Sequence, residues 1–412
     1  MKRRAIIIGG SLAGLLAGNL FHRRGWDVQV FERAAGDLEG RGAGITILPG
    51  LVEGFQAAGA QVSEEMLGIV LPARMALDRE GAVVADYPFA QAMTSWGLLY
   101  ESLRKIFPTS NYHGGATLTR VEQDAHSVTA VFADGQRISG DLLIGADGLR
   151  SVVRSQFLPA LIPHYAGYVA WRCLTDEAAL PAASFAGLFE RYTVCVAPGE
   201  QAIGYPVPGP DHSKAAGRRQ YNVVWYHSVR APEELRRFMT DDSGRHHPNG
   251  IPPALLSKKL RDEMIDTAPR VLAPPFAEAI RLGRMHFFQP IMDIEPPNLV
   301  FGRVAIVGDA GFVTRPHVAM GVPKGAGDVL ALAQALDERI SISDALEKFE
   351  SQRMRVGRNI VARGRYLGSY MEAQIGNDAQ RKAAERARVP RDVMMETASP
   401  FDYDCPRNRI VS

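Results

Sequence analysis

The sequence of 412 residues is poor in cysteine, in net charge and in long apolar segments. Its three cysteines, Cys173, Cys195 and Cys405, lie far apart and form no C-x-x-C pair, which indicates neither a disulfide framework nor a metal site. With 47 basic and 45 acidic residues the formal charge is only +2, so the composition predicts no nucleic-acid partner and no anionic membrane. No uncharged apolar run reaches the ~18 residues of a membrane helix, and we therefore expect a cytoplasmic protein.

What the chain does contain is typical of a folded protein with many turns. Hydrophobic residues make up 46% and charged residues 22%, and there are 40 glycines and 26 prolines. The length is too great for one small core and suits two fused lobes. The short runs of strand-like and helix-like pattern alternate near both ends, which predicts an α/β fold.

The first motif is a glycine-rich turn between a strand and a helix. Residues 4–9 form a short apolar run, the leucines of 12–24 recur at helical spacing, and a second strand-like run ends at Glu32. The turn Gly9-Gly10-Ser11-Leu12-Ala13-Gly14 is a G-x-G-x-x-G in which Ser11 replaces the second glycine. Such a turn presents backbone amides to a pyrophosphate at a helix N-terminus, and an acid such as Glu32 accepts hydrogen bonds from a ribose. A purely structural glycine turn remains the alternative at this point.

The rest of the chain divides into segments with different expected secondary structure. A glycine-rich loop is expected at 41–50, strands at 68–76 and 82–86, a helix at 98–107, and a meander that ends in a buried strand at 142–146. Strands separated by turns dominate from about 160 to 300, and a mostly helical segment follows from 324 to 390. These patterns predict a cofactor lobe in two parts around an inserted lobe, with the boundaries 1–160, 161–295 for the β-rich substrate lobe, 296–345 for the return segment and 346–412 for C-terminal helices.

Two further motifs follow buried strands. The segment DLLIGADGLRSVVR, from Asp141 to Arg154, carries Asp147-Gly148, and VAIVGDAG places Asp309 after another apolar run, where an acid can hold the ribityl hydroxyls of a flavin. With these three motifs in order, the chain resembles the FAD-dependent class A aromatic hydroxylases, which are single-component flavoprotein monooxygenases. The segments 94–104, 165–172, 205–209 and 315–328 are similar to the subgroup of 2,6-dihydroxypyridine 3-hydroxylases.

The resemblance implies a Rossmann-like FAD-binding lobe of the para-hydroxybenzoate-hydroxylase type, an inserted mixed β-sheet substrate lobe and C-terminal helices. It also implies a set of cofactor-binding residues. The first turn, with Gly9, Ser11, Leu12, Ala13 and Gly14, would hold the FAD pyrophosphate, and Glu32 and Arg33 the adenosine ribose. Arg41 would lie near the flavin, either Tyr100 or Arg104 would reach the pyrophosphate, and the Val121 backbone would hold adenine. Asp147 and Asp309 complete the nucleotide site, with Pro316, Gly321, Val322 and Lys324 at the flavin.

The resemblance further implies the reaction. NADH or NADPH binds transiently and reduces FAD, dioxygen adds to give a flavin C4a-hydroperoxide, and its distal oxygen attacks an electron-rich ring such as a hydroxypyridine or a phenol. His317 either orients or deprotonates the substrate or is a loop histidine at a helix cap. Tyr205 and Tyr226 are candidates to face the ring, although buried core positions are the commoner role of tyrosine, and Arg172 is expected to be structural. The strand 193–199 lacks the arginine with which benzoate-type members hold a carboxylate, which favours an uncharged or differently anchored ring.

Other functions remain open from the residues alone. A plain NAD-dependent dehydrogenase leaves the motifs at Asp147 and Asp309 unexplained, and the four dispersed tryptophans do not form the element of a halogenase. A flavoprotein of reductase-like chemistry and a non-catalytic flavin-binding module are the further alternatives. The basic helices around 353–365 predict either a solvated face or the contact of a homodimer. The sequence does not choose between NADH and NADPH, nor does it fix the ring or the position that is hydroxylated.

Overall fold

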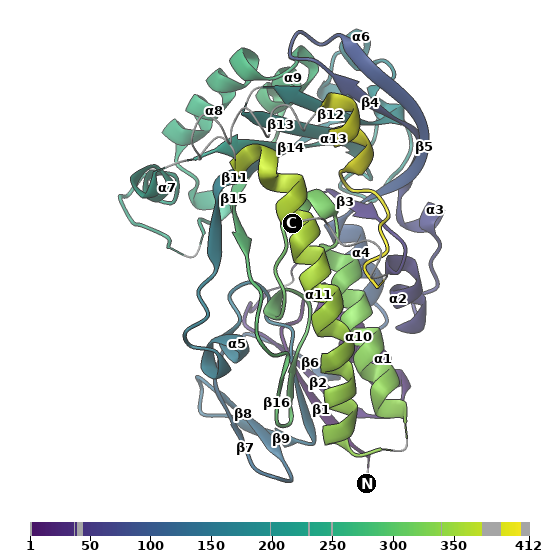
Figure 1. The fold of residues 1–412 in the computed structure, drawn as a ribbon, viewed down its shortest axis with the longest axis vertical. Helices are drawn as coiled ribbons and strands as arrows, with labels where there is room; N and C mark the ends of the chain where they lie inside the picture. The colour runs from purple at the N-terminus through teal and green to yellow at the C-terminus, as the bar shows by residue number, and fades with distance from the viewer. Residues whose placement is uncertain are drawn as a thin grey trace.

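The computed structural model describes residues 2–36, 38, 44–197, 199–229, 231–248, 250–338, 340–372 and 389–404, and within them the chain forms two large sheets and one small one. Figure 1 shows the two large sheets at opposite ends of an elongated molecule, with the long helix α11 (Ile342–Glu372) running between them. The alternation of strands and helices confirms the predicted α/β class.

The first sheet has six strands in the described part of the chain and is largely parallel. Its order is β16 (Val300–Phe301), β17 (Val304–Ile306), β10 (Leu142–Gly145), β1 (Arg4–Ile8), β2 (Asp27–Glu32) and β6 (Tyr112–Gly114). Only the β16–β17 pair is antiparallel. Strand β1 therefore lies between β2 on one side and β10 on the other, so the chain switches direction across the sheet at this point.

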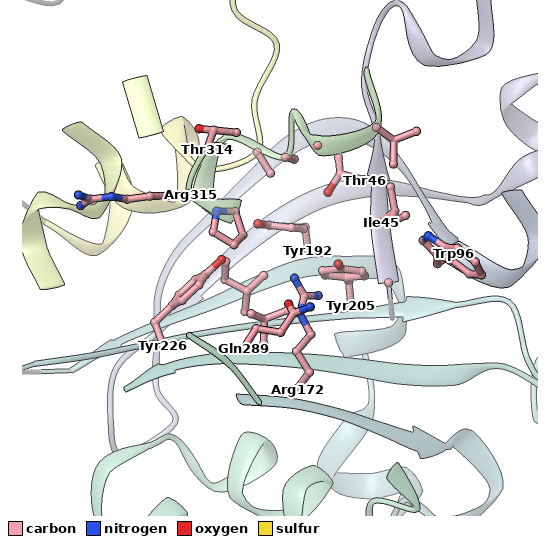
Figure 2. Close-up of a pocket in the computed structure, with 18 of the residues that line it drawn as sticks. Ile45, Thr46, Trp96, Arg172, Tyr192, Tyr205, Tyr226, Gln289, Thr314 and Arg315 are labelled. Atoms are coloured by element: carbon pink, nitrogen blue, oxygen red, sulfur yellow. The ribbon is translucent and has the colours of Figure 1, made fainter. Parts of the chain in front are cut away.

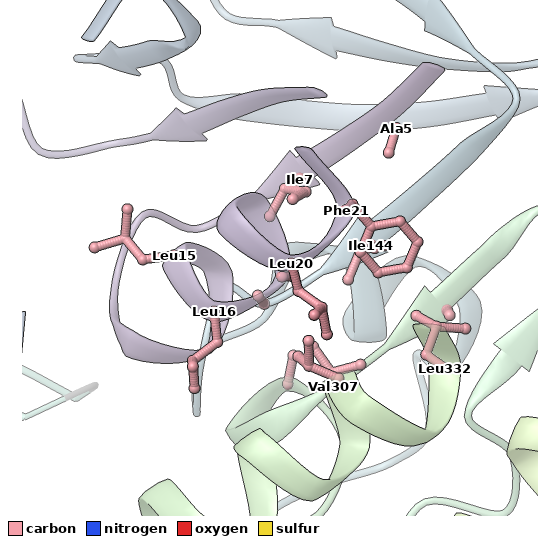
Figure 3. Close-up of a cluster of buried hydrophobic side chains, with 14 of the residues drawn as sticks. Ala5, Ile7, Leu15, Leu16, Leu20, Phe21, Ile144, Val307 and Leu332 are labelled. Carbon is pink, nitrogen blue, oxygen red and sulfur yellow. The ribbon is translucent and has the colours of Figure 1, made fainter. Parts of the chain in front are cut away.

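A single apolar core holds this sheet against its helices. The leucines of α1 (Leu12–Arg23) at positions 12, 15, 16 and 20 are buried because their helical spacing puts them on one face. Figure 3 shows Leu20 and Phe21 of α1 packed with Ile7 of β1 and Leu332 of α10 (Gly321–Asp337). The first and last thirds of the sequence thus share one core, whereas the division into a cofactor lobe and an inserted substrate lobe stays a prediction.

The second sheet has eight strands in the described residues and is mainly antiparallel. Its order is β15 (Met285–Asp293), β11 (His164–Asp176), β14 (Gln220–Ser228), β13 (Glu200–Val207), β12 (Arg191–Ala197), β4 (Ile69–Leu77), β5 (Val83–Ser95) and β3 (Gly44–Ile47). Side chains alternate between its faces. On β11, Trp171 and Cys173 join the core under α8 (Lys258–Val271) and α9 (Pro274–Leu282), whereas Tyr168 and Ala170 belong to the opposite face.

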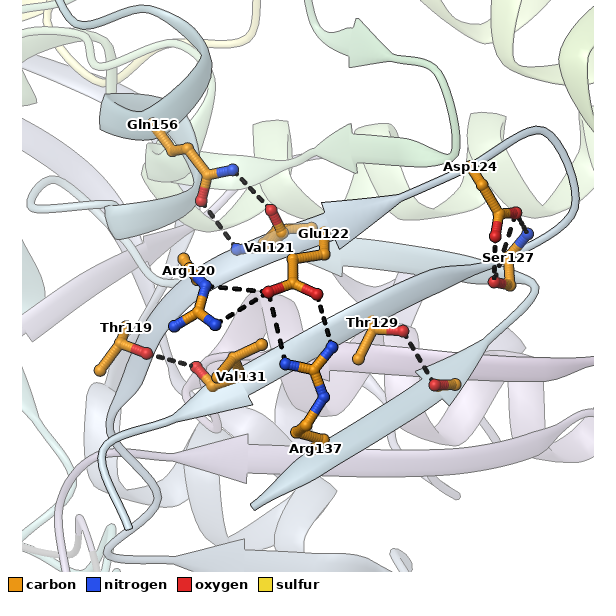
Figure 4. A network of polar contacts seen from close by, with 11 residues as sticks. Thr119, Arg120, Val121, Glu122, Asp124, Ser127, Thr129, Val131, Arg137 and Gln156 are labelled. Atoms are coloured by element: carbon orange, nitrogen blue, oxygen red, sulfur yellow. Dashed lines mark hydrogen bonds and ion pairs between the residues drawn. The ribbon is translucent and has the colours of Figure 1, made fainter. Parts of the chain in front are cut away.

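A three-stranded meander lies beside the first sheet: β7 (Leu118–Gln123), β8 (Val128–Phe132) and β9 (Arg137–Gly140). On its exposed side, Glu122 pairs with Arg120 and Arg137 (Figure 4). Gln156 of α5 (Val152–Phe157) fastens the meander from the other side, since its amide donates to the Val121 carbonyl and accepts from the Val121 N–H, both at 2.7 Å.

The remaining helices connect or cover the sheets. They are α2 (Leu51–Ala57), α3 (Glu64–Leu67), α4 (Trp96–Arg104), α6 (Ala182–Phe185), α7 (Pro232–Phe238) and α13 (Pro390–Glu396). No helix in the described residues is long and apolar enough to cross a membrane.

Two expectations about organisation were wrong. The glycine-rich segment before residue 50 contains the strand β3, because Gly44–Ile47 pairs antiparallel with the end of β5. More importantly, β3, β4 and β5 belong to the eight-stranded sheet although they lie within the predicted cofactor segment 1–160. The parallel pairing of β12 with β4 joins segments more than a hundred residues apart, and local sequence pattern carries no information on such pairing.

Candidate active site

The three motifs meet at one edge of the six-stranded sheet. They follow the carboxyl ends of β1, β10 and β17, which are neighbours in the sheet. Gly9 has φ +105°, and a Cβ there would lie 2.3 Å from the Ala146 carbonyl oxygen that precedes the second motif. A Cβ at Gly14 would lie 1.8 Å from the Gly9 carbonyl oxygen. Both glycines are therefore required by close backbone approach, as the first motif predicted.

A first cavity of about 280 Å³ opens beside this turn. Ser11 at the N-terminus of α1 lines it, and the serine side chain makes no capping bond to the helix. Glu32 and Arg33, at the end of β2, line the same cavity. The buried Glu32 carboxylate accepts hydrogen bonds from the N–H groups of Gly10 at 2.8 Å and Ala34 at 2.9 Å, which fixes the acid beside the turn.

Asp147 also lines the first cavity, but its carboxylate is engaged by its own motif. It accepts the Ser151 hydroxyl at 2.5 Å and the Val152 N–H at 2.7 Å, so it holds the start of α5. Arg154 connects the second motif to the third, because its guanidinium donates to the carbonyls of Asp309 at 3.1 Å and Ala310 at 3.0 Å. The second motif thus positions the third.

A second cavity, of about 290 Å³, lies between the eight-stranded sheet and the third motif (Figure 2). The sheet contributes aromatic and polar side chains that share one face, namely Arg172, Tyr192, Ile203, Tyr205, Val224, Tyr226, Phe287 and Gln289. The opposite wall comes from Asp309, from residues 314–316, and from Gly321 and Val322 at the N-terminus of α10. The two lobes therefore enclose this cavity together.

Trp96 links the two cavities, because it lines both. Neither of the residues predicted from this helix does so. Tyr100 is fully buried and stacks on Trp96, with ring centroids 5.0 Å apart, and Arg104 lies over the Tyr112 ring at 4.5 Å. Tyr112 in turn donates to the Gly10 carbonyl at 3.2 Å, so Arg104 supports the first turn from behind.

Asp309 and Lys324 face each other at the start of α10. The Lys324 side chain is 1% exposed, and its Nζ lies 3.5 Å from Oδ1 of Asp309, whose side chain is 49% exposed. That ammonium donates no hydrogen bond within the described residues. Burying a cation whose only nearby carboxylate is this distant costs free energy. We therefore expect a further polar group to bind beside Lys324 and Asp309.

Burial controls the ionisation of the tyrosines in the second cavity. Burial raises the pKa of Tyr205 to about 12 and also raises the pKa of Tyr226, although the nearby Arg172 charge opposes both shifts. At neutral pH both side chains are therefore phenols that donate or accept hydrogen bonds, and neither is a base.

Arg315, on the opposite wall of the second cavity, forms an ion pair with Asp293 at 2.8 Å, and both side chains are fully buried.

His317 lies behind the cavity wall. It is 0% exposed, it does not line either cavity, and its Nε2 is 2.9 Å from the Tyr168 hydroxyl. Its ring packs on that of Tyr226, with centroids 4.1 Å apart. The structure thus brings His317 and Tyr226 together but gives the histidine no direct path to a bound ring, so deprotonation of substrate by His317 itself is not supported.

The C-terminal segment 389–404 closes one side of the second cavity through Ala398. Its anchor is the fully buried Arg74, which donates to the carbonyls of Met394 at 2.7 Å, Thr397 at 2.8 Å and Ala398 at 2.9 Å. Burial lowers the pKa of Arg74 to about 10.

The remaining predicted residues divide into three groups. Pro316, Gly321 and Val322 line the second cavity, and their contact with a flavin stays a prediction. Leu12 is buried, and Ala13 packs with its Cβ 3.1 Å from the position that a Cβ on Gly308 would take, so these two support the turn. Arg41 lies outside the described residues.

The prediction for Val121 was wrong. Its N–H and carbonyl both pair with Gln156, so that backbone is not offered to a ligand, and Leu118, three residues earlier, lines the first cavity instead. Sequence reasoning also missed Trp96, Tyr192 and Gln289. The alternation within the strands could have grouped Tyr192 with its face of the sheet, but no sequence signal distinguishes a cavity-lining face from a packed one.

Comparisons with known proteins agree with this geometry. The FAD binding domain family matches residues 2–175, and a family described as FAD binding domain-like matches residues 165–293. The chain is 28% identical to 2,6-dihydroxypyridine 3-monooxygenase from Paenarthrobacter nicotinovorans over 90% of this chain and 91% of that protein. The solved structure of 2,6-dihydroxypyridine-3-hydroxylase from Arthrobacter nicotinovorans superposes with a TM-score of 0.85 at 26% identity, covering 92% and 94% of the two chains. Klebsiella pneumoniae HpxO complexed with FAD and uric acid gives a TM-score of 0.74 at 26% identity, covering 95% and 92%.

Proposed function

We propose that the chain is an FAD-dependent aromatic hydroxylase and that it uses NAD(P)H and dioxygen to hydroxylate a small, electron-rich aromatic or N-heteroaromatic ring. The observation that carries this proposal is the second cavity, where an aromatic sheet face meets the N-terminus of α10 and the third motif. The named relatives support ring hydroxylation rather than a halogenase-like, reductase-like or non-catalytic role.

The residues fit FAD at both cavities. Ser11, Glu32 and Arg33 would hold the nucleotide end in the first cavity, while Asp309 and the buried ammonium of Lys324 would hold polar groups nearer the second. A Cβ at Gly321 would meet nothing within 4 Å, so space remains against the N-terminus of α10. That helix end is positive and stabilises negative charge by about 0.3–1 kcal/mol, more when it is partly buried. When bound, FAD supplies the transfer of electrons from NAD(P)H and the activation of dioxygen.

The chain's own residues hold and orient the ring. Tyr205 and Tyr226 project from adjacent strands into the cavity, as Figure 2 shows, and their neutral phenols can donate hydrogen bonds to an oxygen substituent of the ring. Such donation orients the ring and stabilises the negative charge that this oxygen carries when the ring hydroxyl is ionised, which is the electron-rich form of the ring. His317 fixes the ring plane of Tyr226 by packing against it and acts as a positioning residue.

Water must be kept from the reacting centre, because activated oxygen is otherwise released without product. The two lobes and the C-terminal segment provide this enclosure, with Ala398 at the cavity wall. The Ala398 N–H donates to the His317 carbonyl at 2.8 Å, so the segment is joined to the loop that faces the sheet.

One experiment tests the proposal. The purified protein should be yellow with bound FAD, and its oxidation of NAD(P)H should accelerate when a hydroxypyridine or a phenol from a panel is added, with a product heavier by one oxygen atom. A colourless protein that takes up no FAD, or a flavoprotein whose NAD(P)H oxidation responds to no ring, would contradict it. The same assay chooses between NADH and NADPH, while a homodimer and a cytoplasmic location stay predictions.

A further inference from the structure

We infer that Arg172 is the specificity-determining residue of the second cavity and binds an anionic oxygen on the ring substrate, either a carboxylate or an ionised ring hydroxyl. This inference rests on the proposed function, because it names the class of ring that the same cavity accepts. It revises the expectation that Arg172 is structural.

The position of Arg172 carries the first step. It lies on β11 on the same face as Tyr168 and Ala170, next to Val224 of β14 and Phe287 of β15. Figure 2 shows its side chain rising from the sheet into the cavity beside Tyr205 and Gln289. A structural arginine in this sheet would be expected to cap a strand or pair across it, whereas this one points where a ring would lie.

The charges around the cavity carry the second step. Three of its lining side chains are charged in the described part of the chain: Asp309, Arg315 and Arg172. Arg315 pairs with Asp293, and Asp309 lies near Lys324. For Arg172, the described residues supply no carboxylate within ion-pair distance, and its Nε donates to the amide oxygen of Gln289 at 3.2 Å. The cavity therefore holds one positive charge that the described chain does not balance.

The geometry of the guanidinium carries the third step. Gln289 accepts the Nε–H, and no group of the described residues accepts from the two terminal nitrogens, so these nitrogens can bind a carboxylate or a pair of ring oxygens in a forked arrangement. The neighbouring phenols of Tyr205 and Tyr226 stay protonated at neutral pH, so they do not compete for the cation as phenolates. They are instead further donors toward the same oxygen.

The test compares matched pairs of ring probes that differ in one anionic group, with binding to the FAD-loaded protein measured by titration calorimetry. The first pair is 6-hydroxynicotinate and 6-hydroxynicotinamide, and the second is 2,6-dihydroxypyridine and 2-hydroxypyridine. Arg172→Met should weaken binding of the anionic member about 10- to 100-fold, which corresponds to the loss of one or two charge-assisted hydrogen bonds. The affinity for the neutral member should stay unchanged. Loss confined to the first pair identifies a carboxylate as the bound group, and loss confined to the second identifies a ring oxyanion.

Two control variants separate binding from structure. Arg172→Lys keeps the charge and should restore part of the preference for the anionic member. Arg284→Met removes an exposed arginine just before β15 that pairs with Asp176 away from the cavity, and it should change the binding of neither probe. Thermal unfolding of each variant, recorded with FAD bound, reports any structural effect.

The inference is overturned if Arg172→Met weakens both members of each pair equally while lowering the unfolding temperature, or if it changes neither member. The proposed function fails separately, when the wild-type protein converts no ring to an oxygenated product. In that case an Arg172-dependent preference for the anionic probe would still establish the anion site.

Discussion

Replacement of Arg74 by methionine should release the C-terminal segment 389–404 without unfolding the rest of the protein. In the wild type this guanidinium donates five hydrogen bonds, to three carbonyls of the segment, to Ser399 and to Gln91. Methionine fills a similar volume between the Phe89 and Tyr192 rings, over which the arginine carbon lies at 4.1 and 4.9 Å, but it donates nothing. The change therefore isolates the hydrogen bonds from the packing.

The loss of local stability follows from the number of acceptors in the segment that lose a hydrogen bond from Arg74. Ala398 keeps a bond from the Gln91 amide at 2.6 Å, and Ser399 still donates to Met395, so the carbonyls of Met394 and Thr397 are the two groups of the segment that lose most. At about 1 kcal/mol for each, the segment loses about 2 kcal/mol of local stability, which is about a 30-fold increase in its open population.

Amide hydrogen exchange measures this directly. The N–H groups of Val393, Thr397 and Ala398, which are hydrogen-bonded in the closed segment, should lose protection by that factor, while amides of β1 should keep theirs. Arg191→Met is the matched control, because Arg191 lies on β12 beside β4 and binds the exposed Asp86. Unchanged protection of the segment in a folded Arg74→Met protein would refute the reasoning and assign the closure to apolar packing of Val393 and Met394.

Three further outcomes test the cofactor site and the cavity. Ser11→Leu should fill the first cavity at the α1 N-terminus and weaken FAD binding at least tenfold, about 1.4 kcal/mol, in a flavin titration, whereas Ser11→Gly should not; equal affinity in all three proteins would show that the pyrophosphate lies elsewhere. Glu32→Gln presents an amide N–H to one of two backbone N–H groups and should cost about 1–3 kcal/mol in chemical unfolding, and an unchanged midpoint would contradict the bonding described. Because burial raises the pKa of Tyr205 to about 12, the folded state keeps a proton that the unfolded chain releases near pH 10; stability should therefore fall as pH rises between those values, and the fall should be smaller in Tyr205→Phe, with equal slopes refuting the shift.

The glycine turn and the acid beside it could be predicted because their geometry depends on short stretches of sequence. At Gly9 and Gly14 the backbone leaves no room for a Cβ, so the residue type reports the turn. Glu32 follows at the end of the next strand, where a strand–helix–strand unit places it beside that turn. The wrong predictions in the same lobe named a residue a few positions away from the one that lines a cavity. Leu118 rather than Val121, and Trp96 rather than Tyr100, line the cavities. Sequence pattern alone does not resolve a shift of three or four residues.

The sequence by itself therefore determined the fold class, the binding turn and the class of cofactor, because each depends on residues within a few positions of one another. Only the tertiary structure decided which side chains line the second cavity. The second cavity joins residues from Gly44 to Ala398, and their convergence depends on the pairing of β12 with β4 and on which face each strand turns to the third motif. Arg172 shows the difference most clearly: in the sequence it is one arginine after a tryptophan, and in the fold it is a cation that the described residues leave without a carboxylate partner.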